Sequence, residues 1–191
     1  MSNNTLGDLF TGKLLRLGVV RNEDREHYAR WSNDAEYMRL LDDEPIHPKT
    51  PEMFNFPRSE DSWGGVGFGL RTLAEDKFIG FTGLWGVNWS SRSSWFAIGI
   101  GDRDYWGKGY GTEAVDLTVG YAFRELSLNR VQLFVFAYNL RAIRAYEKVG
   151  FVREATLRQS LLRDGKRYDT YLMGILYRDW ESKRAAQHNA G

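Results

Sequence analysis

The chain contains no cysteine among its 191 residues. This absence excludes disulfide bonds, thiolate metal ligands and a cysteine nucleophile. Histidine is nearly as rare, since only His27, His47 and His188 are present, and their positions form none of the usual metal-binding spacings. We therefore expect no metal site and no acyl-cysteine intermediate.

The chain also lacks a marked excess of charge of either sign. Lys and Arg total 26 and Asp and Glu total 25, which argues against a general nucleic-acid-binding protein. No apolar run approaches the ~18 residues needed to cross a membrane. The first ten residues, MSNNTLGDLF, lack the charged-then-apolar pattern of a signal peptide. We expect a cytoplasmic protein that binds neither nucleic acid nor a membrane.

Proline is scarce as well, and all four prolines fall within residues 42–61. This segment is the longest stretch for which we expect no regular structure. Long irregular segments in compact domains often serve as lids or substrate loops, and disorder is the simpler alternative.

Elsewhere the patterns predict regular elements in the order of a single α/β (α+β) domain on a mixed sheet, spanning residues 1–191. Residues 1–12 are expected to form a loose lead-in and residues 181–191 a C-terminal tail. We predict strands over 13–20, 65–73, 77–87, 94–101 and 130–137, helices over 23–32, 110–126 and 139–148, a further helix ending near residue 41, a hairpin turning at RDG (163–165) and a short closing helix. Asn22 or Asp24 is the expected cap of the first helix.

Three glycines alternate with larger residues in YWGKGYGTEA (105–114), just before a predicted helix. The loop matches neither the GxxxxGK[ST] nor the GxGxxG phosphate motif. A helix N-terminus preceded by glycine nevertheless presents free N–H groups to an anion. We therefore predict that the backbone from about Gly107 to Thr112 binds a pyrophosphate; the alternative is a glycine-rich tight turn.

Two motifs in the correct order, DRDYWGKGYGTEAV and NLRAIRAYEKVGF, resemble the GNAT N-acetyltransferase superfamily. The similarity is closest to its ribosomal-protein N-terminal acetyltransferase (RimJ/RimL-like) branch. It extends over nearly the whole chain through LLRL, RWSNDAEYMR, FIGFTGLWGV and DGKRYDTYLMGILYRDW. The resemblance implies a bent, mostly antiparallel mixed sheet with splayed central strands and helices on both faces.

The resemblance also implies acetyl-CoA as co-substrate. The family's loop begins with Arg or Gln, whereas this chain has Trp106 at that position, so Lys108 is a candidate to supply charge instead; its alternative is a solvated loop lysine. The implied cofactor-binding residues are Ile98, Gly99, Ile100, Trp106, Gly107, Lys108, Gly109, Tyr110, Gly111, Thr112 and Asn139.

The implied reaction is direct acetyl transfer to an amine. Backbone N–H groups near Ile98–Ile100 would stabilise the oxyanion. Tyr146 matches the family's tyrosine general acid, and a phenol with a pKa of about 10 suits protonation of a thiolate whose thiol titrates near 8.5; the alternative is a core tyrosine. The glutamate that many relatives carry as a base is replaced by Ala97.

An α-amino group, with a pKa near 8, needs the least help in losing its proton, which favours a protein N-terminus as acceptor. The alternative is that water relays the proton to a loop carboxylate. A small amine such as a polyamine or aminoglycoside, and a non-catalytic acetyl-CoA-binding module, remain alternatives. The acidic run Asp42, Asp43 and Glu44 is a candidate site for a cationic acceptor, or a solvated turn. Trp31, Trp85 and Trp89 are candidates to line the acceptor cleft, or core residues. A homodimer through the C-terminal hairpin edge is also possible.

Overall fold

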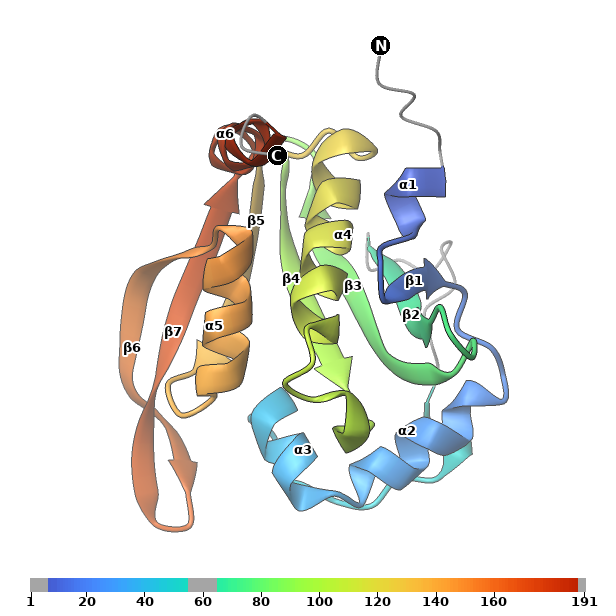
Figure 1. The fold of residues 1–191 in the computed structure, drawn as a ribbon. Coiled ribbons are helices and arrows are strands. Elements are labelled where there is room, and N and C mark those ends of the chain that lie inside the picture. The colour runs from blue at the N-terminus through green and yellow to red at the C-terminus, as the bar shows by residue number, and fades with distance from the viewer. Residues whose placement is uncertain (1–6, 55–64, 189–191) are drawn as a thin grey trace.

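The computed structural model describes residues 7–54 and 65–188, and in this part of the chain seven strands form one sheet. Their order is β1-β2-β3-β4-β5-β7-β6, and every neighbouring pair is antiparallel except β4 and β5, which are parallel (Figure 1). The strands are β1 (Leu15–Gly18), β2 (Val66–Thr72), β3 (Phe78–Asn88), β4 (Ser93–Ile100), β5 (Arg130–Phe136), β6 (Val152–Arg163) and β7 (Lys166–Leu176).

Helices cover both faces of the sheet, as predicted. The α-helices are α1 (Gly7–Phe10), α2 (Asp24–Ser32), α3 (Ala35–Leu41), α4 (Tyr110–Arg124), α5 (Leu140–Val149) and α6 (Tyr177–His188), and the 3-10 turns are η1 (Pro51–Met53) and η2 (Arg103–Tyr105). Figure 1 shows α4 and α5 side by side on one face. On that face Thr82 of β3 lies 3.1 Å from Thr118 of α4. The adjacent Phe81 packs against Tyr28 of α2, so α2 lies on the opposite face, since side chains alternate along a strand.

The two central strands, β4 and β5, separate soon after they begin. Only Ser93–Trp95 pair with Arg130–Gln132, although β4 continues to Ile100 and β5 to Phe136. The main hydrophobic cluster fills the space under α4 and α5 on one side of this opening. The predicted splay of the central strands is therefore confirmed, and it leaves the backbone edge of β4 without a neighbouring strand.

The ends of the chain carry more structure than the sequence patterns indicated. The lead-in expected over residues 1–12 is wrong for residues 7–10, which form α1, where Phe10 packs against Phe68 and Tyr121. The tail expected over residues 181–191 is wrong as far as His188, because α6 continues to that residue. The expected irregular segment contains η1, and residues 55–61 of it lie outside the described residues.

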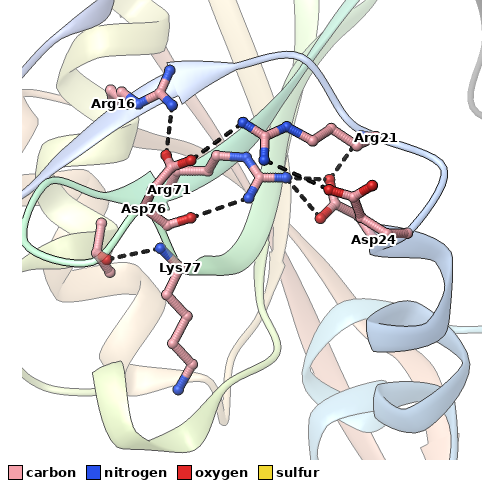
Figure 2. Close-up of polar contacts among 8 residues, drawn as sticks. Arg16, Arg21, Asp24, Arg71, Asp76 and Lys77 are labelled. Atoms are coloured by element: carbon pink, nitrogen blue, oxygen red, sulfur yellow. Dashed lines mark hydrogen bonds and ion pairs between the residues drawn. The ribbon is translucent and has the colours of Figure 1, made fainter.

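A buried ion pair fixes α2 to the sheet (Figure 2). Arg71 of β2 places Nη2 2.7 Å from both carboxylate oxygens of Asp24, and the two residues are 4% and 1% exposed. Asp24 also accepts a 2.7 Å bond from the Arg21 backbone N–H, and Arg71 donates to the Asp76 carbonyl at 3.1 Å. The expected cap of α2 is therefore corrected: Glu23 occupies the N-cap without a side-chain bond, and Asp24 is held by Arg71 instead.

Candidate active site

A cavity of about 720 Å³ lies where β4 and β5 separate. Its walls come from α3, from β3, β4 and β5, from the glycine loop, from α5 and from the β6–β7 hairpin. The size is in the range of cavities that bind small molecules. Most of the predicted site residues, which come from distant parts of the sequence, line this cavity.

The glycine loop needs glycine at two of its three positions for backbone reasons. Gly107 and Gly109 have φ values of +73° and +92°, a backbone region that residues with a side chain rarely adopt. Gly109 is also the N-cap of α4 and supplies no side-chain cap. The first N–H groups of α4 therefore lack an intrahelical partner at a point where Gly109, Gly111 and Thr112 line the cavity.

Gly111 has a different reason to be glycine. It lies inside the first turn of α4 with an ordinary helical φ, and a methyl group added to it would lie 3.6 Å from Ile100 Cδ1, an ordinary contact. Neither the backbone nor the packing of this chain requires glycine there. Because Gly111 lines the cavity, close approach of a ligand explains the missing side chain, and a phosphate at a helix N-terminus fits that description.

The open edge of β4 presents backbone groups of alternate residues. The Gly101 N–H donates to the Ile79 carbonyl of β3 at 3.1 Å, whereas the Ile100 carbonyl accepts from Trp106 Nε1 at 2.7 Å. Successive residues in a strand direct their backbone groups to opposite edges. Ile98 and Ile100 therefore direct theirs toward the opening, and Gly99 directs its backbone groups toward β3.

Trp106 forms a platform for a cation that the sequence analysis missed. The Arg141 guanidinium lies 3.6 Å from the Trp106 ring centroid, and the Arg103 guanidinium lies 5.2 Å from it. Arg141 lines the cavity and has no acidic partner within ion-pair distance in the described part of the chain, and burial lowers its pKa. Lys108, which the sequence suggested as the source of charge, does not line the cavity. The sequence could have indicated Arg141, because it lies only two residues after Asn139, a predicted cofactor-binding residue.

The start of α5 is fixed by Asn139, which is buried and has two roles. Its Oδ1 accepts from the Ala142 N–H at 3.2 Å, and its Nδ2 donates to the Leu40 carbonyl of α3 at 3.3 Å. Asn139 therefore caps α5, and the cap also joins α5 to α3. Arg144 and Lys148 follow Arg141 along α5 at helical spacing, and all three line the cavity, which gives this wall a positive charge.

Tyr146 of α5 lies in the main hydrophobic cluster and also lines the cavity. It is 7% exposed, and its hydroxyl makes no hydrogen bond with any residue that the structure describes. Burial raises its pKa well above the ordinary value of 10, so the hydroxyl stays protonated at neutral pH. A protonated hydroxyl without a partner beside a cavity is suited to donate a proton to a ligand.

Another part of the cavity wall is acidic and aromatic. Asp42 and Asp43, which follow α3, line it, and Glu44 does not. Ala97 lines the cavity without supplying a carboxylate. Trp85 lines it too and is 44% exposed.

The remaining tryptophan candidates lie elsewhere. Trp31 is buried in the cluster between α2 and β3, and Trp89 is exposed away from the cavity. Of the predicted cofactor-binding residues, Lys108 and Tyr110 do not line the cavity, and the Tyr110 ring packs on Tyr105. The other predicted residues that line it are Ile98, Gly99, Ile100, Trp106, Gly107, Gly109, Gly111, Thr112, Asn139 and Tyr146.

Within the described ranges 7–54 and 65–188, no group of three or more His, Asp or Glu side chains could hold a metal ion. No helix in those ranges is both long enough and apolar enough to span a bilayer.

Comparison with known proteins agrees with this geometry. Residues 15–152 match the family model described as Acetyltransferase (GNAT) domain. The protein named probable N-acetyltransferase YjcK of Bacillus subtilis (strain 168) is 36% identical over 114 residues, which span 60% of this chain and 63% of that relative. YdaF of the same strain, provisionally named a ribosomal N-acetyltransferase, is 29% identical over 171 residues, 88% of each chain.

Among solved structures, a spermidine N-acetyltransferase from Vibrio cholerae in complex with CoA and spermine has a similar fold. The TM-score is 0.76 at 24% identity, covering 87% of this chain and 98% of that one.

Proposed function

The chain belongs to the family of acetyltransferase (GNAT) domains, and from this we propose that it is an acetyl-CoA-dependent N-acetyltransferase. The observation that carries the proposal is the single cavity between β4 and β5. It joins the glycine loop and Tyr146 on one side to an open acidic and aromatic wall on the other. Such a cavity lets a thioester enter from one side of the sheet and an amine reach its carbonyl carbon from the other.

We propose that the N–H groups at the start of α4, together with Arg141, bind the pyrophosphate of acetyl-CoA. Arg141 thereby supplies the side-chain contact that Trp106 cannot make, because the one N–H of its indole already donates to the Ile100 carbonyl. The backbone groups of Ile98 and the Ile100 N–H pair with the amide-containing arm as an added strand would. Asn139, at the junction of α3 and α5, borders the same arm.

We propose direct transfer as the chemistry. The neutral amine nitrogen attacks the thioester carbonyl carbon, and the oxyanion is stabilised by a β4 N–H group. The nitrogen loses a proton to water, and the carbon–sulfur bond then breaks. Tyr146 donates its proton to the departing thiolate. Its burial supports this role, because a raised pKa keeps the proton on the hydroxyl until a strong acceptor forms.

The proposed acceptor is a protein N-terminal α-amino group. Ala97 supplies no carboxylate base, so an amine with a pKa near 8 is favoured because part of it is neutral at pH 7. The similarity to the provisionally named ribosomal acetyltransferase YdaF supports this choice.

A small cationic amine is the second candidate. Asp42 and Asp43 line the cavity on the acceptor side, and Trp85 stacks on Trp95, which stacks on Phe134 at ring-centroid distances of 5.6 and 4.8 Å. Carboxylates and exposed aromatic faces both attract cations. The structural similarity to a spermidine acetyltransferase is consistent with this candidate.

The absence of cysteine makes the test direct, because the protein adds no thiol background. Acetyl-CoA is incubated with the protein and peptides beginning with Ser, Ala or Met, and in parallel with spermidine, an aminoglycoside or free amino acids. We expect release of CoA thiol with the peptides. Release with spermidine or the aminoglycoside alone would show that the acceptor is a small cationic amine and not a protein N-terminus. CoA-dependent stabilisation without release from any acceptor would favour a non-catalytic binding module.

A further inference from the structure

Tyr37 of α3 is a buried residue of the cavity that the chemistry above does not use. It is 5% exposed, lies beside the Trp31 ring and lines the cavity. Its hydroxyl is buried and has no hydrogen-bond partner among the residues that the structure describes. An unsatisfied buried hydroxyl lowers stability, so its presence beside a cavity points to a ligand that completes it.

The position of Tyr37 is fixed from two directions. Asp34 caps α3 by accepting from the backbone N–H groups of Glu36 and Tyr37 at 3.0 and 3.1 Å. Arg103, just before the glycine loop, binds Asp34 through Nε and Nη2 at 2.7 and 2.6 Å and Glu36 through Nη1 at 2.6 Å. The first turn of α3 is thereby joined to the segment that carries the predicted pyrophosphate site.

The Tyr37 hydroxyl lies directly over Gly99 of β4. A methyl group built on Gly99 would be 2.5 Å from the hydroxyl oxygen and 2.7 Å from Phe81 Cε1, which are distances that real atoms do not adopt. The absent side chain of Gly99 therefore provides the space that the hydroxyl occupies. Gly99 stands between Ile98 and Ile100, the two residues that direct backbone groups into the opening.

We propose that the Tyr37 hydroxyl donates a hydrogen bond to the carbonyl oxygen of the acetyl group, from the acceptor side of the sheet, and becomes a second donor to the oxyanion. The inference rests on the proposed acetyl-CoA function and adds a residue to it. No bond to Tyr37 forms or breaks, and the hydroxyl keeps its proton throughout.

The electrostatic surroundings agree with a donor and not with a base. Burial, and next the nearby Asp34 carboxylate, raise the pKa of Tyr37 above its ordinary value. The hydroxyl therefore remains protonated at neutral pH. A neutral donor in a water-poor site stabilises a developing negative charge more strongly than the same group in water.

Tyr37→Phe tests the proposal, with Tyr28→Phe as the matched control. Tyr28 belongs to the same aromatic cluster and is equally buried, but it does not line the cavity. Calorimetric titrations with CoA and with acetyl-CoA measure the acetyl contact without requiring turnover. We expect the wild type to bind acetyl-CoA more tightly than CoA, and Tyr37→Phe to reduce acetyl-CoA affinity about 5- to 10-fold while leaving CoA affinity unchanged.

The kinetic expectation for Tyr37→Phe is a fall of about 100-fold in kcat with little change in the KM for the acceptor. The melting temperature should not fall, because the variant removes an unsatisfied buried hydroxyl. Equal affinities of wild type and Tyr37→Phe for acetyl-CoA, or no preference of the wild type for acetyl-CoA over CoA, would overturn the proposal. If no amine released thiol but Tyr37→Phe still lowered the affinity for acetyl-CoA and not for CoA, only the proposed catalysis would be refuted.

Discussion

The guanidinium carbon of Arg141 lies 3.6 Å from the centroid of the Trp106 ring. Trp106 itself is held by its hydrogen bond to the Ile100 carbonyl at the edge of β4. The indole thus links the strand to the guanidinium that lies over its ring. The indole fixes Arg141 at the glycine loop, and no carboxylate among the described residues forms an ion pair with it. A guanidinium fixed in this way binds a phosphate with little loss of side-chain entropy.

Arg141→Ala is therefore expected to weaken acetyl-CoA binding by about 1.5 to 3 kcal/mol, the range for hydrogen bonds to charged groups. Titration calorimetry with CoA measures the change. Lys108→Ala is the matched control, because Lys108 neighbours the same loop but does not line the cavity, and it should bind CoA as the wild type does. A larger effect at Lys108 than at Arg141 would restore the original expectation from the sequence.

Gly111→Ala should separate stability from binding. The methyl group has room in the folded protein, and alanine is favoured over glycine within a helix by about 0.5–1 kcal/mol, so the free protein should unfold at a higher temperature. The same methyl group should obstruct the approach of the pyrophosphate and raise the Kd for CoA at least tenfold. Unchanged CoA binding would show that the ligand does not approach this residue.

Tyr146→Phe should reduce kcat by about 100-fold or more while acetyl-CoA still binds, as expected for loss of a general acid. The raised pKa of Tyr146 also predicts the pH profile of the wild type. With a peptide acceptor, kcat/KM should rise through the pKa of the α-amino group near 8 and should not decline below pH 10, since the phenol remains protonated there. A decline between pH 8 and 9 would assign the acid to another group.

Asp24→Asn should destabilise the protein by about 3 kcal/mol, because it removes the charge partner of a buried arginine (Figure 2). Urea unfolding measures the loss. Asp76→Asn, which disrupts the exposed pairs with Arg16 and Arg21 in the same network, is the control and should change the midpoint little. Similar losses from both substitutions would show that burial does not decide the strength of these pairs.

The sequence patterns identified most elements because their signals are local. Gly150 ends α5 with a φ of +125°, and Asp164 and Gly165 form the hairpin turn with φ values of +49° and +72°, so each residue type reports its own backbone conformation. The chain ends were misjudged for the opposite reason. Phe10 and Trp180 are held by Phe68 and Phe123, contacts that no local pattern reveals.

The sequence by itself determined the glycine loop, the capped α5 and the family resemblance, since each depends on residue types at fixed short spacings. Only the tertiary structure decided which side chains share the cavity. Tyr37 and Gly99 are 62 positions apart and meet because Asp24 and Arg71 hold α2, and α3 beside it, against the sheet. Arg141 and Trp106 are 35 positions apart and meet where the start of α5 lies beside the segment that follows β4. Such meetings depend on packing between elements, and no local spacing encodes them.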